Sequence, residues 1–516
     1  MKTLLLIFTI ILVNVSFSQN NWLRSIGSSA NEEMKDLTFD SNGDIVLVGY
    51  YSGNLNTGAG ILNSAGNTDV LVVKTDANGD AIWAVSAGGT GVDRANAVAS
   101  DNNGNTYITG YFQSNATFGT INVSGQGWEA YVAKIDVNGN FVWVETFGGT
   151  SGDIGHGIAV DNANNVICVG EYKGTGTFGP DVLTSQANSY DVFITKLDQN
   201  GNFIWTEDGN APFDDKAVSV TVGSNNNIYV IGRFSNDITF QNTHNTTLLN
   251  AGFLVSLDQN GNELWFDHMW GTQVLLTDVK WQNNKILLTG DFRSNLLLDD
   301  NNGVQNFAGV EEYNVFAARF SETGALDWLT ANYSTDEVHS RQIALDPNNN
   351  IYITGYFNCT FSEMNDFYGN ATFMSLGYED VHYIKYNFNG AFQWARQMAS
   401  NDPDISNSIA IETVDLPVIT GTHEGTFYVP AGSSFSFLPG QQDDYNENNC
   451  GDANYGLFAQ EPSAGQRDIF WTSPFDVNRD PLDYFMKNPG LSCDLDVYPP
   501  CIGTVITFND CLDTLE

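Results

Sequence analysis

The chain has 516 residues, of which 42% are apolar and 13% aromatic, so it can bury a sizeable core and is too hydrophobic to be mainly disordered. Its 20 Lys and Arg residues against 61 Asp and Glu residues give a net charge of −41, which argues against nucleic acid or an anionic membrane as a partner. The 50 glycines and a charged fraction of only 16% favour many short strands joined by tight turns over long helices.

Residues 1–18 have the pattern of a signal peptide. Lys2 is followed by the apolar stretch Leu4–Val13, and the small residues Ser16 and Ser18 precede a cleavage site. No later run approaches the roughly 20 apolar residues of a membrane helix. We therefore expect a secreted or cell-surface protein with no membrane span, whose mature chain begins near Gln19.

An internal repeat occupies most of the remaining chain. One marker is a tryptophan that recurs at intervals of 60 to 66 residues. These are Trp22, Trp83, Trp143, Trp205, Trp265, Trp328 and Trp394. A glycine after an alternating stretch recurs with the same period, at Gly49, Gly110, Gly170, Gly232, Gly290, Gly355 and Gly421. Two markers with one period indicate seven copies of one supersecondary unit.

The second copy predicts the structure of each unit. Residues 97–100, 106–112, 130–135 and 141–146 are short alternating or apolar runs, separated by polar turns and one variable loop. They predict four antiparallel strands. A lone sheet cannot bury both faces, so we expect an all-β, seven-bladed β-propeller over residues 19–440, whose last blade could extend to 471. A solenoid would need a shorter period, and separate sandwiches of this size would each have a marginal core.

The repeated tryptophans have a structural explanation. A carboxylate lies seven residues before the indole in Asp76–Trp83 and in three later copies, with Asn-Gly in the turn between them. Asn-Gly is typical of a type I′ hairpin, and the indole would then pack between adjacent blades. Ser321 and Asn387 replace the acid in two copies, so the carboxylate is not obligatory. Cation binding by the turn acids is the alternative.

Ring closure requires the two ends of the repeat array to meet. Trp22–Ile26 resembles the strand that follows the Asn-Gly turn elsewhere, so it could complete the last blade, and Trp471 could do so instead. The sequence leaves this choice open.

The unit GGTGxDxAxAVAxDxxGNxYxTGYF…DxxVxKxDxNGNxxW resembles the SBBP repeat, a β-propeller repeat of exported proteins of Bacteroidota. The resemblance covers about residues 22–440 and recurs six or seven times. It implies a propeller fold and an exported location, and it implies no particular reaction.

Residues 441–516 form an acidic extension that contains four of the six cysteines. In an exported chain Cys450, Cys493, Cys501 and Cys511 suggest disulfides, for which three pairings exist, with free or intermolecular thiols as the alternative. Cys168 lies in an apolar strand and is expected to be a small buried residue, as is Cys359.

One set of acids repeats in register and is the candidate metal site. Each member precedes an apolar residue of a first strand by five positions. The set comprises Glu32, Asp93, Asp153, Asp215 and Asp404. Equivalent positions of a propeller lie on a circle, so these acids could form a ring that binds calcium. The alternative is that each acid accepts hydrogen bonds from its own loop. We assign no catalytic residue and no other cofactor.

Two classes of function remain open. In the first, a non-catalytic propeller presents Phe, Tyr and Asn from the loops around 112–119, 172–180 and 357–368 to an extracellular glycan or protein. In the second, a hydrolase or lyase acts on polysaccharide in the central pocket. That function requires residues that one unit has and the others lack, such as His156 or Asp291 with Arg293. We favour the binding module.

Overall fold

The computed structural model describes residues 22–27, 32–245, 250–300, 303–332, 337–358, 362–366, 369–373, 379–398, 403–413, 416–423, 426–430, 457–462 and 468–473. Within these ranges the chain consists of β-strands, turns and one 3-10 helix, Gln186–Asn188, and no helix has the length and apolarity needed to cross a membrane. The named strands pair antiparallel, so the predicted all-β class is confirmed.

The strands group into four-stranded units that follow one another along the chain. Unit 1 contains β2 (Glu33–Phe39), β3 (Ile45–Tyr51), β6 (Asp69–Thr75) and β7 (Ala81–Gly88). Unit 2 contains β8 (Arg94–Ser100), β9 (Thr106–Phe118), β10 (Ile121–Ile135) and β11 (Phe141–Gly149). Unit 3 contains β12 (Ile154–Val160), β13 (Val166–Lys173), β16 (Tyr190–Leu197) and β17 (Phe203–Gly209).

The next two units share one long strand. Unit 4 contains β18 (Lys216–Val222), β19 (Ile228–Phe234), β22 (Ala251–Leu257) and the first half of β23 (Glu263–Gln282). Unit 5 contains the second half of β23, β24 (Lys285–Asp300), β25 (Gly303–Ser321) and β26 (Leu326–Asn332).

The last two units complete the ring. Unit 6 contains β27 (Val338–Leu345), β28 (Ile351–Phe357), β31 (Asp380–Tyr386) and β32 (Phe392–Met398). Unit 7 contains β33 (Asp404–Thr413), β34 (Leu416–His423), β37 (Asp468–Ser473) and β1 (Trp22–Ile26).

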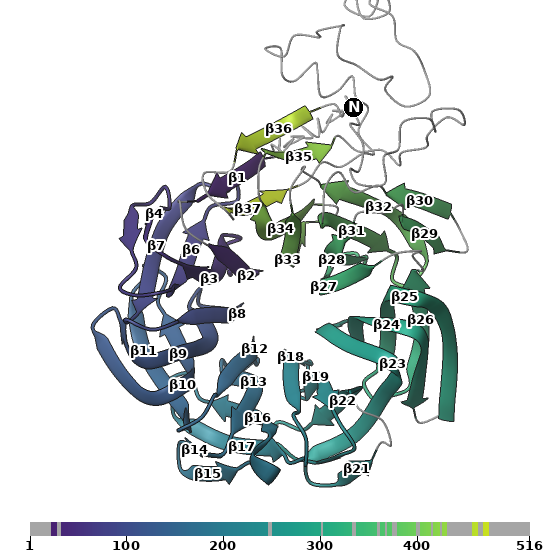
Figure 1. Cartoon of the computed structure of the whole chain (residues 1–516), viewed down its shortest axis with the longest axis horizontal. Coiled ribbons are helices and arrows are strands. Elements are labelled where there is room, and N and C mark those ends of the chain that lie inside the picture. Colours follow the sequence, from purple (N-terminus) through teal and green to yellow (C-terminus); the bar gives the residue numbers. More distant parts are fainter. Residues whose placement is uncertain are drawn as a thin grey trace, which may run out of the picture.

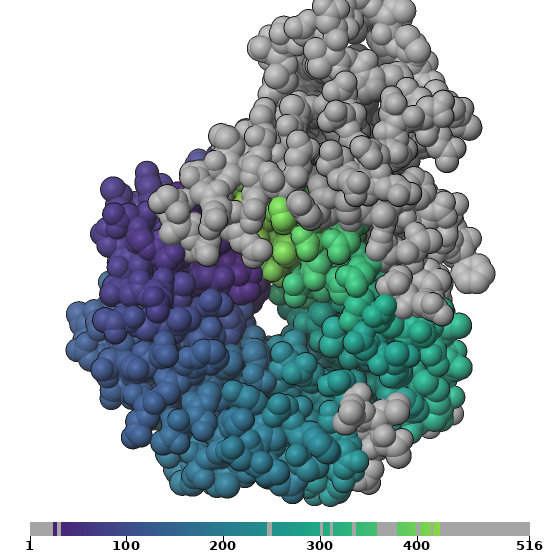
Figure 2. All heavy atoms as spheres, viewed as in Figure 1, coloured from purple at the N-terminus to yellow at the C-terminus, as the bar shows by residue number. Residues whose placement is uncertain are grey.

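The units stand around a central axis, with the first strand of each unit innermost and the fourth strand outermost (Figure 1). An opening passes through the centre of the ring (Figure 2). The apolar cores lie between neighbouring units: Val48 and Val72 of unit 1 pack in one cluster with Val98 and Ile108 of unit 2. Burial on both faces is what radial stacking of twisted sheets provides.

Ring closure uses both ends of the array. Strand β37 pairs with β34 and also with β1, so that Trp22 lies opposite Ser473 and Arg24 opposite Trp471. The sequence left open whether Trp22 or Trp471 completes the last unit, and both strands belong to it, as its third and fourth members. Val418 of unit 7 packs in one cluster with Leu37 and Leu47 of unit 1, so the two units meet.

The variable loop between the second and third strands forms a further hairpin. In units 2 and 5 it is the extension of β9 with β10 and of β24 with β25. Elsewhere it is a separate pair of short strands, namely β4 (Asn54–Asn56) with β5 (Ile61–Asn63), β14 (Thr175–Phe178) with β15 (Asp181–Thr184), β20 (Asp237–Thr239) with β21 (Thr243–Asn245), β29 (Ser362–Asp366) with β30 (Gly369–Phe373), and β35 (Thr426–Pro430) with β36 (Leu457–Pro462).

Several of these hairpins join the outermost strand of the preceding unit. Strand β9 pairs with β7 at Phe118 and Ala87, and β14 pairs with β11 at Thr177 and Gly148. This cross-pairing explains why the expected presentation of aromatic side chains by the loops at 112–119 and 172–180 is wrong. Phe112, Phe118, Tyr172 and Phe178 are fully buried, because each hairpin folds back over its neighbour.

Other expectations fall on different parts of the chain. Cys168 is fully buried and unpaired, as predicted for a small strand residue. The signal segment 1–18, Cys359, the extension from 441 to 456 and from 474 to 516 with its four cysteines, and the side chains of Trp22 and Trp471 lie outside the described residues.

Candidate functional site

Five of the repeated tryptophans contact the turn of the following unit. Trp83 Nε1–H donates to Val137 O at 3.1 Å, and Trp143 Nε1–H donates to Gln199 O at 3.1 Å. Trp205 and Trp265 bond in the same way to Gln259 O and Glu322 O. Trp328 lies against Gly390 of the next unit, where a Cβ would stand 2.8 Å from the indole, and Trp394 packs against Tyr352 and Tyr383 within unit 6.

The Asn-Gly turns differ from the predicted type I′ geometry. Only the glycine has a positive φ, as at Gly79 with 79° and Gly139 with 86°, whereas Asn78 and Asn138 do not. The strand register shifts by one residue beside each turn, as between Lys134 and Ile135, which is the mark of a type I turn followed by a bulge. The type I′ assignment is therefore wrong. A Cβ on Gly139 would also lie 3.1 Å from the Trp83 indole, so the position needs glycine for two reasons.

We call the end of the units that holds these turns the tryptophan end. Its cations bond to the turns: Lys134 Nζ donates to Gln199 O and Lys196 Nζ to Gln259 O, both at 3.2 Å. Lys196 also pairs with Asp161 at 2.9 Å, and Lys74 pairs with Asp40 at 2.6 Å. These cations therefore bond either to a turn of the next unit or to an acid of their own unit.

The opposite end, where each first strand begins, carries a β-bulge in every unit. In β2 the pairing with β3 shifts between Met34 and Asp36, so Lys35 is the extra residue. Bulges redirect a side chain out of the regular alternation. The bulged residues are Lys35, Asn96, His156, Val218, Thr277, Arg341 and Asn407. We call this end the bulge end.

The residue after the bulge contributes to a polar belt around the axis. Asp36 accepts the N–H of Val98 in the next unit at 2.9 Å, and Ser408 Oγ accepts the N–H of Leu37 at 3.0 Å, which carries the belt from unit 7 to unit 1. The belt consists of Asp36, Ser219, Asp278, Gln342 and Ser408. Units 2 and 3 have Ala97 and Gly157 at this position.

A charged cluster is part of the same belt. Lys280 Nζ lies 3.1 Å from Asp278 Oδ2. Withdrawal from water raises the pKa of Asp36, and the positive charge of Lys280 opposes this rise. Burial lowers the pKa of Lys280, but the carboxylates of Asp278 and Asp36 outweigh burial and raise it. The centre of the ring therefore holds a cation that stabilises the charged forms of two neighbouring acids.

The five acids of the predicted metal ring are buried. Main-chain N–H groups surround them: Asp93 accepts from Gly89 at 2.7 Å and from Gln113 at 2.9 Å, and Asp153 accepts from Gly149 and Lys173. Asp215 accepts the Ser235 N–H at 2.7 Å. Glu32 and Asp404 are buried at the same position of units 1 and 7.

A second carboxylate lies 24 residues before four of these five acids, and the sequence analysis missed it. Asp69 and Asp93 flank Gly88, where a Cβ would lie 2.7 Å from Asp69 Cγ and 2.8 Å from Asp93 Oδ2. The second carboxylates are Asp69, Glu129, Asp191 and Asp380, all buried. The described residues contain no group of three or more His, Cys, Asp or Glu that could hold a metal, and calcium binding by the ring stays a prediction.

Burial shifts the titration of these acids. It raises the pKa of Asp215 to about 8, with a further contribution from the charge of Asp191, and raises that of Asp191 to about 7. Burial also raises the pKa of Glu129 to about 7 and those of Asp93 and Asp153 to about 6. Near neutral pH this end therefore carries less negative charge than its acid count suggests.

Cations at the bulge end are held on tyrosine rings. Arg94 lies 4.0 Å from the centre of the Tyr50 ring, Arg341 lies 5.0 Å from that of Tyr356, and Lys173 lies 4.9 Å from that of Tyr190. In unit 4, Lys216 and Arg233 stand directly opposite each other on adjacent strands. Across the described part of the chain, none of these five cations has a carboxylate within ion-pair distance. They are Arg94, Lys173, Lys216, Arg233 and Arg341.

The contact between units 5 and 6 differs from the contacts between the other units. His339 Nδ1 lies 2.9 Å from Asp291 Oδ2, and the His339 ring lies between the rings of Tyr313 and Tyr356 at 4.5 and 4.9 Å. The Ser340 hydroxyl also donates to Asp291, at 2.7 Å. Within the described residues His339 Nε2 has no hydrogen-bond partner. His156, the histidine that the sequence singled out, lies 3.5 Å from Glu171 in unit 3.

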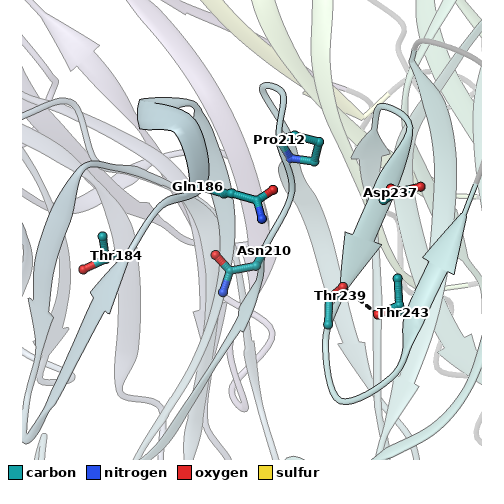
Figure 3. Close-up of a pocket in the computed structure, with 7 residues that line it drawn as sticks. All are labelled: Thr184, Gln186, Asn210, Pro212, Asp237, Thr239 and Thr243. Atoms are coloured by element: carbon teal, nitrogen blue, oxygen red, sulfur yellow. Dashed lines mark hydrogen bonds between the residues drawn. The ribbon is translucent and has the colours of Figure 1, made fainter.

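A polar cavity of about 510 Å³ lies between the hairpins of units 3 and 4 (Figure 3). The side chains around it are mainly amides and hydroxyls, and Thr239 and Thr243 bond to each other at 3.0 Å. It is lined by Thr184, Gln186, Asn210, Pro212, Asp237, Thr239 and Thr243. Such groups bond well to sugar hydroxyls, but this cavity has no aromatic wall on which a sugar could stack.

No protein-family model matches the chain. An uncharacterized WD repeat-containing protein of Acanthamoeba polyphaga mimivirus is 22% identical over 429 residues, which cover 66% of this chain and 31% of the relative. Regulatory protein FlaEY of Caulobacter vibrioides is 30% identical over 190 residues, which cover 35% of this chain and 20% of the relative. The chain thus spans less than a third of the length of these curated relatives.

The chain is also similar to several solved structures. A protein of unknown function from Bacteroides caccae has 8% identity and a TM-score of 0.33, covering 64% of this chain and 89% of that one. A Synechocystis apocarotenoid oxygenase mutant has 10% identity and a TM-score of 0.36, covering 78% and 89%. The repeat-containing relative and the ring of antiparallel sheets together support a β-propeller fold.

Proposed function

We propose that this chain is an exported, seven-bladed β-propeller of the SBBP-repeat type that acts as a binding or adhesion module for an extracellular glycan or protein. Units 1 to 7 are the blades, and the pairing of β1 with β37 closes the ring. The signal-like segment at residues 1–18 supports export.

The contrast between the two ends of the propeller supports this proposal. Cations at the tryptophan end bond to the turns of the next unit, as Lys134 and Lys196 do. At the bulge end, five cations in the described chain lack a carboxylate partner, and Arg341 is exposed. A propeller that used this end only for packing would gain nothing from unpaired charge, so a ligand is the better explanation.

A binding screen tests the proposal. The purified mature chain is applied to an array of extracellular glycans and matrix proteins, and a panel of polysaccharides is monitored in parallel for breakdown. Saturable binding without turnover supports a binding module. Failure to bind any glycan or protein on the array contradicts it.

A polysaccharide hydrolase or lyase is the second candidate, and the Asp291–His339 pair is the observation that favours it. Asp291 holds His339 Nδ1, which leaves Nε2 as the atom able to accept a proton, with Arg341 two residues further along the strand. Ser340 bonds to Asp291 instead of to the imidazole, so the three side chains do not form a nucleophile triad.

Turnover separates the two candidates. An enzyme would release reducing ends, or unsaturated products absorbing in the ultraviolet, from at least one polysaccharide. Replacing His339 by Ala would abolish this release, and a melting curve of the variant would check that its fold is intact. Binding that survives His339→Ala, with no product from either protein, favours the binding module.

A further inference from the structure

We propose that the bulge end binds a carboxylate-bearing polysaccharide through Arg94, Lys173, Lys216, Arg233 and Arg341. The inference rests on the proposed binding function and adds the face of the propeller and the chemistry of the ligand.

The positive charge of these cations is not neutralised by an acid at ion-pair distance within the described chain. A cation on a tyrosine face keeps its full positive charge, because the ring quadrupole attracts it without neutralising it. Arg94 on Tyr50 and Arg341 on Tyr356 are in this state. The Nε atoms of Arg94 and Arg233 are buried and have no hydrogen-bond partner in the described chain. A buried guanidinium nitrogen without an acceptor is costly, so the described chain does not fully compensate these two side chains.

Unit 4 contains a pair of like charges, which also supports this proposal. Lys216 and Arg233 are direct cross-strand partners, and like charges in that arrangement destabilise a sheet. Burial lowers the pKa of Lys216, the charge of Glu171 raises it, and Arg233 lowers it further. Glu171 is shared among His156, Lys216 and Arg233, so one acid serves three bases. An incoming carboxylate would relieve this local excess of positive charge.

The positions of the five cations indicate a long ligand. The five cations belong to units 2, 3, 4 and 6, so they are spread around the mouth of the central opening. A single small anion cannot reach all of them. A polymer with a charge on each repeating sugar can contact several at once, and each further contact is then intramolecular.

The net charge of −41 does not prevent this interaction. At physiological ionic strength the Debye length is about 8 Å, so a ligand at the bulge end is affected mainly by the nearest charges. Carboxylates match the fork of guanidinium donors, and three of the five cations are arginines.

The test compares four polymers on the full mature chain. Polygalacturonate, dextran sulfate, neutral dextran and double-stranded DNA are titrated at 0.15 M salt, together with monomeric galacturonate. We expect polygalacturonate to bind most tightly, its affinity to fall steeply with added salt, and the monomer to bind at least about a hundredfold more weakly.

Variants locate the site. Replacing Arg94 and Arg341 by Gln should weaken polygalacturonate binding about tenfold or more, whereas replacing Lys134 and Lys285 by Gln, an equal change of charge away from the bulge end, should change it less than about twofold. If the double variant melts abnormally, the single change Arg341→Gln, at an exposed side chain, replaces it.

The outcomes are distinct. Loss of binding in the Arg variant with retention in the Lys variant supports the proposal. Equal affinity of both variants overturns it, as does tighter binding of dextran sulfate or DNA than of polygalacturonate. Binding of neutral dextran or of a protein alone overturns this inference but leaves the binding module standing, and absence of all binding contradicts both.

Discussion

At the tryptophan end of the propeller the same contact recurs from unit to unit, whereas at the bulge end each unit contributes a different side chain. Trp83 and Trp143 make the same bond to the next turn. The two ends of the same sheets therefore carry different constraints. At the second position before the bulge, the residues are Glu33, Arg94, Ile154, Lys216, Leu275, His339 and Ile405. Repetition marks the contacts that hold the ring together, and variation marks where a ligand can be distinguished.

The acids of the Asn-Gly turns and the repeated acids of the bulge end also have pKa values shifted in opposite directions. At the tryptophan end slight burial raises the pKa of Asp136, but hydrogen bonds from Asn140 and Asn138 outweigh it and lower the pKa overall. At the bulge end burial raises the pKa of Asp153 to about 6. The turns therefore favour the charged form of their acids, whereas burial at the bulge end raises the pKa of the repeated acids Asp93, Asp153 and Asp215.

Removing one indole should produce the largest effect on stability. Trp143→Ala deletes the contact with Gly201 and the hydrogen bond to Gln199 O, and we expect it to lower the free energy of unfolding by about 3 kcal/mol in urea denaturation. The neighbouring Val142 is 51% exposed, and Val142→Ala should cost less than about 0.5 kcal/mol. Equal losses in the two variants would contradict a docking role for the indole.

Breaking the axial belt should cost less. Gln342 accepts the Ile409 N–H at 2.7 Å and donates to Asp36 at 2.9 Å, so Gln342→Leu leaves the Ile409 N–H unsatisfied and removes one of several hydrogen bonds to Asp36. We expect a loss of about 2 kcal/mol in the free energy of unfolding. Gln393 is exposed and bonds only to neighbouring carbonyls, so Gln393→Leu is the matched control and should be nearly neutral. A neutral Gln342→Leu would show that the belt is dispensable.

The raised pKa values at the bulge end predict a loss of stability as pH rises. Burial raises the pKa of Asp215 from its ordinary value of 3.8 to about 8 in the folded chain. The stability that this carboxyl group contributes is therefore complete below about pH 4 and is lost as the pH rises towards 8. We expect this group alone to lower the free energy of unfolding by roughly 1.3 kcal/mol between pH 5 and 6. Asp215→Asn should flatten this dependence, and an unchanged slope in that variant would contradict the assignment.

The contact between Gly201 and the Trp143 indole should give the smallest effect on stability, and Gly303 provides the control. Gly201 has φ of 91° and faces the Trp143 ring, whereas Gly303 has φ of 101° with nothing within 4 Å of a built Cβ. Both alanine variants share the backbone strain, so the extra loss in Gly201→Ala, about 1 kcal/mol, measures the indole contact. Equal melting curves for Gly201→Ala and Gly303→Ala would show that the ring moves aside without cost.

Much of the fold could be predicted from the sequence, because the period makes structural positions visible. The strands of unit 2 and the tryptophan and glycine markers stand out because each repeats with little change. The bulge at Lys35 was not predicted, since one extra residue in a strand of seven leaves the apolar alternation almost unaltered. Phe118 was misplaced because its burial depends on a hairpin crossing to the preceding unit, which the local pattern does not record.

The candidate site was predicted less well, for a related reason. Asp93 was recognised because it repeats, but its neighbour Asp69 belongs to the preceding unit and is linked to it only by the spatial pairing of adjacent units. The unpaired state of Arg94 depends on which carboxylates lie within reach, and spacing in the sequence does not give that distance. A column of positions compared across all units would have revealed the belt residues such as Asp36 and Asp278.

Hydrogen–deuterium exchange of the mature chain with and without polygalacturonate would locate the binding face. We predict slower exchange in the bulge-end segments 89–96 and 337–341 when the polymer is bound, and no change in the tryptophan-end turns 136–140 and 198–202. Protection confined to those turns would contradict the assignment of the bulge end as the binding face.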